Sequence, residues 1–214
     1  MTLDMPGRSF NLGDPDLWSE LERALELSNG LLWDYFKESL GQAAFLLGVE
    51  DLAENARRYE GLFVPPAGYE TLLKTTKYAE EYFNKHGLEF VKRLTDTDKR
   101  MLRKLLEKHW GVGEDEFARR IKNEYLFSSE RAKRIYRTET HLAHEAGAYA
   151  FASQNGAKFK MWLGNQQNAC PTCSRLNGEI VPVDKPFSFG TMYAHAHPRC
   201  RCTTLYFVKS PYEK

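Results

Sequence analysis

The cysteines impose the strongest constraint on this chain, because all four lie within 33 residues near its C-terminal end. The stretch CPTCSRLNG begins at residue 170 with C-x-x-C, and YAHAHPRCRC ends at residue 202 with C-x-C. Pairs of thiols at such short spacing are typical of tetrahedral metal sites, and in a reducing compartment they are more often ligands than disulfides. We therefore expect a fold that brings the two segments together.

The two segments offer six candidate ligands for an ion that needs four: Cys170, Cys173, His195, His197, Cys200 and Cys202. We expect the first three of the cysteines to bind, with Cys202 or His197 completing the site. An extended segment would place Cys200 and Cys202 on one face, and His197 next to Pro198 could replace either. Four protein ligands close the coordination shell, so the pattern predicts a structural Zn²⁺ site.

Length and hydropathy indicate an intracellular protein with a core of its own. A chain of 214 residues can bury a sizeable core without a staple. No run approaches the roughly 18 apolar residues of a membrane span, and the first residues lack the basic and apolar regions of a secretory signal. We expect no membrane partner.

Charge is distributed unevenly along the chain. Residues 1–100 hold 12 Lys and Arg against 18 Asp and Glu, while residues 101–214 hold 18 against 11. A basic half can face phosphates or an acidic protein surface, and the alternative is a set of solvated helix faces. Arg131, Lys133 and Arg134 are candidate contacts to DNA or to a partner protein.

The sequence before residue 157 predicts a series of helices. Asp14 as N-cap and Pro15 at the first helical position would begin the first of them. Capping preferences give the other expected boundaries: helix ends near Gly30, Gly48, Gly87 and Gly111, and an N-cap at Thr95 or Thr97. The stretch VGEDEFARRIKNEYLF predicts a further short amphipathic helix.

The stretch from residue 128 to 156 predicts one long helix, capped by Ser128 or Ser129 and ended by Gly156. Glu139 falls on its apolar stripe, where a carboxylate needs a partner. We interpret Glu139 and Arg137 as structural polar residues, with a general base as the alternative for Glu139.

The same helix contains HLAHE at 141–145, which reads H-x-x-H-E. It fails the H-E-x-x-H pattern that chelates zinc in metalloproteases. We expect His141 and His144 to lie on the solvated surface.

The remaining residues predict a small β module. KFKMWL alternates, EIVPV is β-branched, and CTTLYFV is rich in strand formers. The expected fold class is α+β: a mainly helical N-terminal two-thirds followed by a zinc-stapled β module with the cysteines in its loops. The expected regions are 1–64, 65–157 and 158–214, with a hinge at Pro65, Pro66 and Gly68.

Enzymatic zinc chemistry receives little support from the sequence. Nucleobase deaminases carry H-x-E and P-C-x-x-C, but Ala169 precedes this C-x-x-C and H-x-E does not occur. A zinc-dependent nuclease that uses HAHP stays open as an alternative, although no His or Asn follows Cys202. We expect a protein that is not an enzyme.

The C-terminal half also carries a resemblance to a known family. Its elements are S-x-x-R-A at 128–132, R-T-E at 137–139, a K-x-W strand at 160–162, C-x-x-C, L-x-G at 176–178 and H-P-x-C-R-C at 197–202. This ordered pattern resembles the head morphogenesis proteins of tailed bacteriophages, the family of the phage Mu F protein and the minor head proteins. The resemblance covers about residues 75–208.

The resemblance implies a role that composition does not show. Such proteins are minor components of the virion, held inside the capsid near the portal vertex, and they assist head assembly and DNA packaging or ejection. The implied partners are the portal protein, the major capsid or scaffold protein and packaged double-stranded DNA, with host cytoplasm as the place of assembly. Some relatives carry a toxin domain after this module, and a toxin-like effector is the alternative function.

Overall fold

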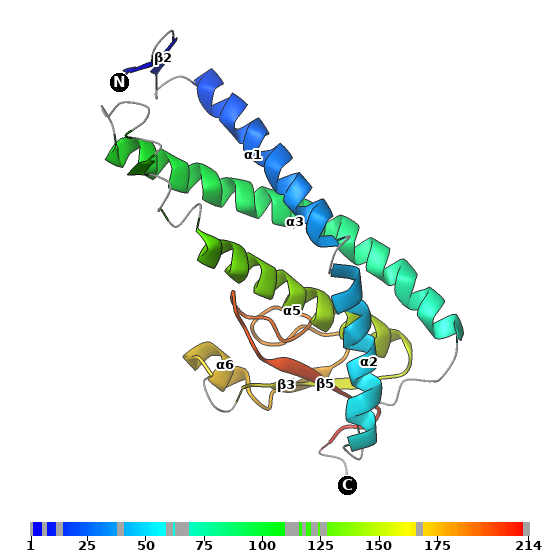
Figure 1. The fold of residues 1–214 in the computed structure, drawn as a ribbon. Helices are drawn as coiled ribbons and strands as arrows, with labels where there is room; N and C mark the ends of the chain where they lie inside the picture. The colour runs from blue at the N-terminus through cyan, green and yellow to red at the C-terminus, as the bar shows by residue number, and fades with distance from the viewer. Residues whose placement is uncertain are drawn as a thin grey trace. The chain divides into compact units, whose positions relative to one another are not determined.

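The computed structural model is mostly helical with a small antiparallel sheet, which agrees with the expected α+β class (Figure 1). It describes residues 2–5, 8–11, 15–37, 41–58, 62, 69–109, 116, 119–120, 124, 128–165 and 169–211. The helices are α1 (Pro15–Phe36), α2 (Gln42–Arg58), α3 (Tyr69–Lys108), α5 (Ser129–Gln154) and α6 (Pro171–Leu176). The strands are β1 (Thr2–Met5), β2 (Arg8–Asn11), β3 (Phe159–Leu163), β4 (Ile180–Pro182) and β5 (Thr203–Phe207).

The chain divides into two compact units that are interleaved along the sequence. The first unit contains residues 1–36 and 84–133, and the second contains residues 37–83 and 134–214. Both α3 and α5 pass from one unit to the other, because each is one continuous helix across the boundary. The units therefore cut across the expected regions 1–64, 65–157 and 158–214.

The first unit is held by a buried polar contact between α1 and α3. Asn29 donates hydrogen bonds from Nδ2 to Thr95 Oγ1 and to Asp98 Oδ2, both at 3.2 Å. All three side chains are buried, so each needs these partners. Nearby, the Trp33 ring packs on Phe90 with centroids 5.0 Å apart.

Several predicted helix ends are wrong. Gly30 lies inside α1, Gly48 inside α2 and Gly87 inside α3. Thr95 and Thr97 are interior residues of α3 rather than N-caps.

The glycines have another role at two of these positions. A Cβ added to Gly87 would overlap the indole of Trp33, and one added to Gly48 would overlap the carbonyl oxygen of His144 on α5. These glycines therefore permit close packing, which the sequence alone does not distinguish from a C-cap.

The start and end of α5 confirm the capping prediction. Ser128 Oγ accepts a hydrogen bond from the backbone N–H of Arg131 at 3.2 Å, as an N-cap does. After Gln154 the chain turns at Gly156, whose φ of 110° is readily adopted by glycine. The sequence then leads directly into β3.

The sheet of the second unit has the order β4-β3-β5, with both pairs antiparallel. The three expected strand segments are confirmed. Alternation places Lys160, Trp162, Thr204 and Tyr206 on one buried face, where Lys160 pairs with Tyr206 and Trp162 with Thr204. Leu62 adds an isolated bridge to Phe207.

Helix α5 packs against that buried face (Figure 1). One apolar cluster joins α2, α5 and β5: Leu52, Ala148, Phe151, Ala152, Ala157 and Tyr206. A second cluster contains Trp162, Leu176, Phe187 and Ala194 together with Cys173, Cys200 and Cys202. The cysteines are therefore part of a core.

Lys160 is a charged residue within this core. Its Nζ donates hydrogen bonds to the carbonyl oxygens of Val183 at 3.0 Å and Met192 at 2.7 Å. Burial lowers the pKa of Lys160 to about 8. Lys160 thereby ties two loops to β3, which gives the lysine of the K-x-W segment a structural role.

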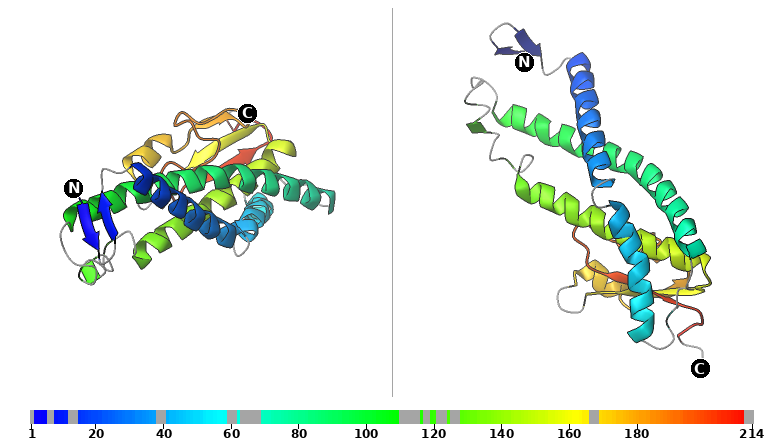
Figure 2. Two further views of the ribbon diagram at one scale, coloured as in Figure 1. Left: turned by 90° about the horizontal axis from the view of Figure 1, so that it is seen from above. Right: turned by 45° about the vertical axis from the view of Figure 1, so that its right-hand side comes forward.

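The β1–β2 hairpin at the N-terminus was not expected from the sequence (Figure 2). Its register pairs Thr2 with Asn11 and Met5 with Arg8.

None of the helices in the described part of the chain is long and apolar enough to span a bilayer.

Some predictions fall on residues outside the described part of the chain. These are the cap at Asp14, the helix end at Gly111, the hinge at Pro65, Pro66 and Gly68, and most of the helix predicted after residue 111.

Candidate metal centre

The first arm of the site is the short helix α6, rather than the loop that the sequence suggested. Cys170 is its N-cap and Pro171 occupies the first turn, which suits a residue without a backbone N–H. Cys170 Sγ accepts a hydrogen bond from the Cys173 N–H at 3.4 Å. The C-x-x-C spacing therefore forms a helical turn that places both thiols on one side.

The turn is fixed to the sheet from its other end. Asn177 Oδ1 accepts a hydrogen bond from the Gly164 N–H at 2.8 Å, just after β3. The Gly178 N–H donates to the carbonyl of Trp162 at 2.8 Å, and its φ of 84° suits glycine. The L-x-G element of the motif therefore returns the chain to the sheet.

The second arm is the segment that leads into β5. Cys200 and Cys202 are buried while Arg201 between them is exposed, as expected for an extended segment. The Cys200 N–H donates to the carbonyl of His197 at 3.0 Å, which closes a turn around Arg199. Arg199 has a φ of 62°, a left-handed conformation that is uncommon for a side-chain-bearing residue.

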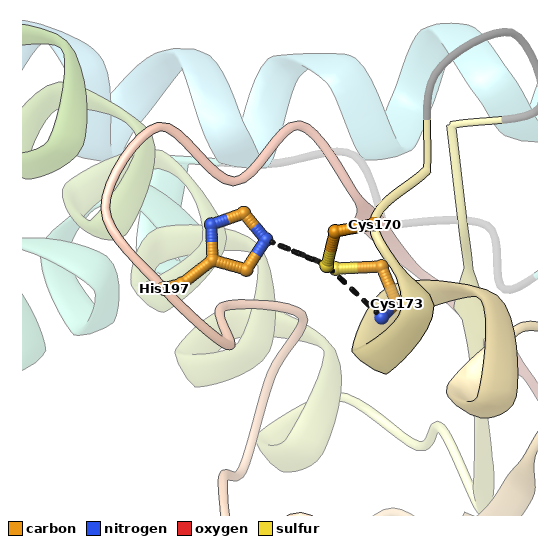
Figure 3. Close-up of side chains that lie close together, drawn as sticks. All are labelled: Cys170, Cys173 and His197. Atoms are coloured by element: carbon orange, nitrogen blue, oxygen red, sulfur yellow. Dashed lines mark hydrogen bonds between the residues drawn. The ribbon is translucent and has the colours of Figure 1, made fainter.

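His197 lies with one ring nitrogen toward the thiols (Figure 3). Its Nε2 is 3.2 Å from Cys170 Sγ and 3.3 Å from Cys173 Sγ. Its Nδ1 is 2.9 Å from the carbonyl oxygen of Pro198, which can only accept, so Nδ1 carries the proton. The same hydrogen bond raises the pKa of His197, and in the neutral ring Nε2 has the free lone pair with which histidine binds a metal.

The ligand atoms form two groups that share Cys173. Cys170, Cys173 and His197 form one group, and Cys173, Cys200 and Cys202 form the other, with the ligand atoms of each within 4.8 Å of one another. The Cys173 and Cys200 sulfurs are 3.9 Å apart. A tetrahedral zinc site with Zn–S bonds of about 2.3 Å places its ligand atoms roughly 3.8 Å apart.

These groups could hold a metal ion. All four cysteines are free thiols, so none is committed to a disulfide. His195, the sixth candidate, belongs to neither group, and its ring faces His141 with centroids 5.9 Å apart.

The thiols differ in how readily they ionise. Hydrogen bonding from the Cys173 N–H lowers the pKa of Cys170 to about 7. Burial raises the pKa of Cys200, but contacts with His141 and with backbone N–H groups outweigh it and bring that pKa to about 6. Burial raises the pKa of Cys173 and of Cys202. A bound cation would therefore have to displace protons mainly from these two.

The polar residues predicted on α5 lie in different surroundings. Glu139 is buried, with 3% of its surface exposed, as its place on the apolar stripe predicted, whereas Arg137 is exposed. Lys133 is exposed and bonds Glu130 at 3.0 Å, and Arg134 is half-buried.

Arg131 has a position that weakens its predicted role. It forms an ion pair with buried Asp98, and only 12% of its side chain is exposed. Arg131 is therefore committed to the protein interior rather than free to contact DNA.

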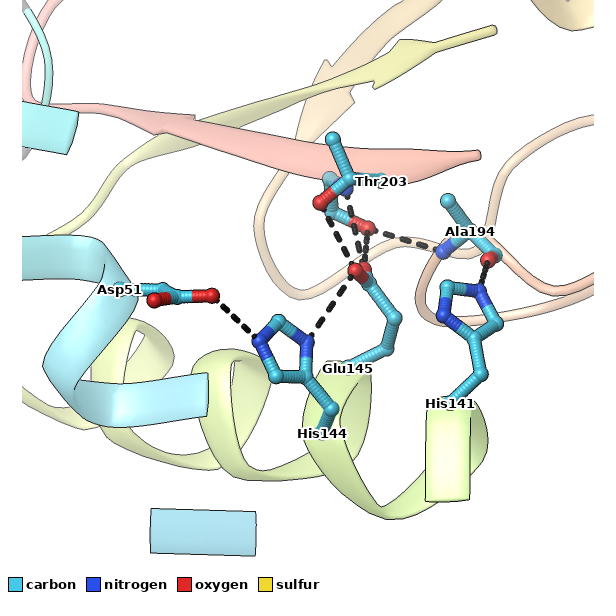
Figure 4. A network of polar contacts seen from close by, with 7 residues as sticks. Asp51, His141, His144, Glu145, Ala194 and Thr203 are labelled. Atoms are coloured by element: carbon cyan, nitrogen blue, oxygen red, sulfur yellow. Dashed lines mark hydrogen bonds and ion pairs between the residues drawn. The ribbon is translucent and has the colours of Figure 1, made fainter. Parts of the chain in front are cut away.

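The expectation that His141 and His144 are solvated is wrong, because both are half-buried. Figure 4 shows the polar contacts that both rings make. His141 Nε2 lies 3.2 Å from the carbonyl oxygen of Ala194, in the loop before the second arm. His144 Nε2 lies 2.7 Å from Asp51 Oδ2 on α2. Interactions with Glu145 and Asp51 raise the pKa of His144.

Glu145 is the structural carboxylate that the sequence analysis missed (Figure 4). It is 1% exposed and accepts hydrogen bonds from Thr203 Oγ1 at 2.8 Å, from the Thr204 N–H at 3.0 Å and from Thr204 Oγ1 at 2.8 Å. These bonds fix β5 to α5 immediately after Cys202. The signal was present in the two threonines that follow the C-x-C pair, since buried threonines need acceptors.

The fold and the site define a class of protein: a small α+β module with a three-stranded sheet and a cysteine and histidine cluster that could hold a metal ion. Residues 108–205 match the family model described as Phage Mu protein F like protein. This segment is therefore similar to that phage family, which confirms the resemblance seen in the motifs, with a match that begins at residue 108 rather than near 75. No curated protein and no solved structure matches the chain significantly.

Proposed function

We propose that the chain is a minor head protein of a tailed bacteriophage that binds the portal vertex inside the capsid and assists head assembly and DNA packaging or ejection. The observation that carries the proposal is the family match over residues 108–205, which spans α5, β3, β4, the first part of β5 and both arms of the cysteine cluster. The portal protein is the partner proposed first, and the major capsid or scaffold protein is the second.

The cluster holds a structural Zn²⁺ ion in this proposal. Cys173 is common to both ligand groups and its sulfur lies 3.9 Å from that of Cys200, so we propose these two as ligands, with Cys170, His197 and Cys202 competing for the remaining positions. Zinc suits the donors, because thiolate and imidazole are its preferred ligands and the ion has no redox chemistry of its own. Its contribution is to fix α6 to the segment before β5.

The chain acts by binding rather than by catalysis in this proposal. Cys173, Cys200 and Cys202 lie among buried apolar side chains, and five donors are available for four positions. A catalytic zinc keeps an open position for water or substrate, which a surplus of protein donors works against.

Native mass spectrometry of the chain, alone and co-expressed with the portal subunit of the same phage genome, tests the proposal. We expect one zinc ion per chain and a portal-bound species. The double variant Cys173→Ser/Cys200→Ser should lose the ion, while Ser174→Ala, an exposed neighbour on α6, should retain it.

Two results would contradict the proposal. A chain that carries zinc but never binds the portal would remove the docking role, and a metal-free wild type would remove the zinc site. Cleavage of plasmid DNA that stops with chelator before the fold is lost would favour a zinc-dependent nuclease.

A further inference from the structure

Beside the metal cluster, the second unit contains a hollow with a volume of about 770 Å³. Its lining comes from one face of α5, from residues 199–203 at the start of β5, and from Asp51 on α2. The volume is in the range of pockets that hold ligands, roughly 300–1,000 Å³. Cys200 and Cys202, two of the candidate zinc ligands, form part of the lining of the hollow, and the proposed structural role of the zinc site gives no function to the arginines beside them.

Three arginines line the hollow: Arg137, Arg199 and Arg201. The local backbone conformation places each of them there. Arg137 projects from α5 one turn before His141, so both lie on the same helix face. In the other wall, the alternation that turns Cys200 and Cys202 inward exposes Arg201. Arg199 precedes them at the left-handed turn.

The turn that carries Arg199 is fastened to α5. The Arg199 N–H donates to Thr138 Oγ1 at 3.2 Å, and Thr138 Oγ1 donates to the carbonyl oxygen of Arg134 at 2.7 Å. Thr138 follows Arg137 directly, so the two walls are joined next to two of the arginines. The arrangement is therefore built into the fold.

The carboxylates of the lining already have partners. Glu145 is buried and accepts three hydrogen bonds from Thr203 and Thr204. Asp51 is paired with His144 at 2.7 Å (Figure 4). Within the described part of the chain, neither Arg137 nor Arg201 has an ion pair, and both are exposed. An excess of guanidinium groups therefore faces the hollow.

We propose that this hollow binds the phosphate groups of the backbone of double-stranded DNA. A guanidinium group matches a phosphate in geometry and charge, and it stays ionised at any physiological pH. The choice of DNA over an acidic peptide rests on the proposed function, which places the chain beside the packaged genome, and on the basic composition of residues 101–214. Contacts of this kind position a protein on DNA without reading its sequence.

Fluorescence anisotropy with the full chain and a labelled DNA duplex tests the proposal. The informative variant is Arg137→Gln/Arg201→Gln, which removes two charges from the hollow. The matched control is Arg175→Gln/Lys209→Gln, which removes two exposed charges from the same unit but outside the hollow. Circular dichroism and zinc content should equal those of the wild type in both.

We expect the hollow variant to bind about tenfold more weakly or worse near 0.1 M salt and to reduce the salt slope of log K by about 2. The control should stay within about twofold. Two duplexes of unrelated sequence should behave alike.

Three outcomes would overturn the proposal. The first is an equal loss in both double variants, since it would show a general charge effect. The second is the absence of DNA binding by the wild type. The third is that the wild type binds poly-glutamate and the hollow variant does not, while both bind DNA equally. This result would identify an acidic peptide site. If portal binding and zinc persist in any of these, only the hollow fails and the proposed head function stands.

Discussion

At the scale of single residues, the structure separates charged side chains that serve the fold from those that face outward. Arg131 and Arg137 lie six residues apart on α5, yet the first is paired with buried Asp98 and the second lines the hollow. Composition and spacing could not make this distinction, because it depends on the side chain of α3 that lies next to Arg131, which is Asp98. The buried carboxylate at Glu139 was predictable from helical periodicity, whereas Glu145 required knowledge of β5.

The pair of Arg131 and Asp98 leads to a prediction about pH. Burial raises the pKa of Asp98 above its usual value, and the nearby Arg131 opposes that rise. In Arg131→Gln the opposition is lost, so the pKa of Asp98 in the folded chain rises further. The folded state then binds a proton more tightly than the unfolded state, and the free energy of unfolding falls as pH increases through that interval.

We expect Arg131→Gln to lower the free energy of unfolding by about 3 kcal/mol near neutral pH, because it leaves a buried charge unpaired. The loss should be smaller near pH 4.5, where Asp98 is more protonated. Urea unfolding at both pH values measures it. Lys133→Gln removes an exposed cation from the same helix and should have little effect at either pH. A loss of equal size at both pH values would contradict the assignment to Asp98.

At the scale of elements, strands and caps were predicted better than helix ends. The capping prediction for α5 and all three strands of the sheet were confirmed, because alternation and capping are local signals. The helix ends predicted at Gly48 and Gly87 were wrong, because glycine occurs both at helix ends and where another element packs closely against a helix. The two roles differ in the residue that packs against the glycine, and that residue is distant in sequence: His144 for Gly48 and Trp33 for Gly87.

The crossing of α2 and α5 supplies a test. Gly147 on α5 faces the carbonyl oxygen of Phe45 on α2, and an added Cβ would overlap that oxygen. Since backbone atoms cannot move aside cheaply, we expect Gly147→Ala to lower the free energy of unfolding by about 1–3 kcal/mol. Gly30→Ala on α1 is the control, because a Cβ there meets nothing within 4 Å.

The control should move in the opposite direction. Alanine is a better helix former than glycine, so Gly30→Ala should stabilise the chain by up to about 1 kcal/mol. Urea denaturation of the two variants beside the wild type gives the comparison. A Gly147→Ala protein as stable as the wild type would show that the two helices do not cross this closely.

At the scale of the whole molecule, the sequence located the cysteine and histidine cluster but not the way the chain divides into units. The spacing of C-x-x-C and C-x-C was sufficient to predict that residues 27 positions apart would meet, as Cys173 and Cys200 do. The interleaved units were not predictable from composition, because α3 and α5 each continue from one unit into the other without any break in pattern. Continuity of a helix is therefore a poor guide to a domain boundary.

The division of the cores predicts how the molecule responds to loss of metal. The cluster with Trp162, Leu176 and Phe187 includes three of the cysteines, while the cluster with Leu52, Phe151 and Tyr206 includes none. If zinc holds α6 to the segment before β5, a chelator should loosen the first cluster and leave the second in place. The first unit, which contains the contact between Asn29 and Asp98, should be unaffected.

Hydrogen exchange before and after chelation measures this order. The Gly178 N–H, which bonds the carbonyl of Trp162, and the Cys200 N–H, which bonds that of His197, should lose protection first. Amides in the middle of α5 and in residues 84–108 of α3 should exchange as before. Added Zn²⁺ should restore the protection of the Gly178 and Cys200 amides. Loss of protection at all amides would instead mean that the metal supports one cooperative unit. Unchanged protection at Gly178 and Cys200 would mean that the thiols and His197 hold this part of the fold together without a metal.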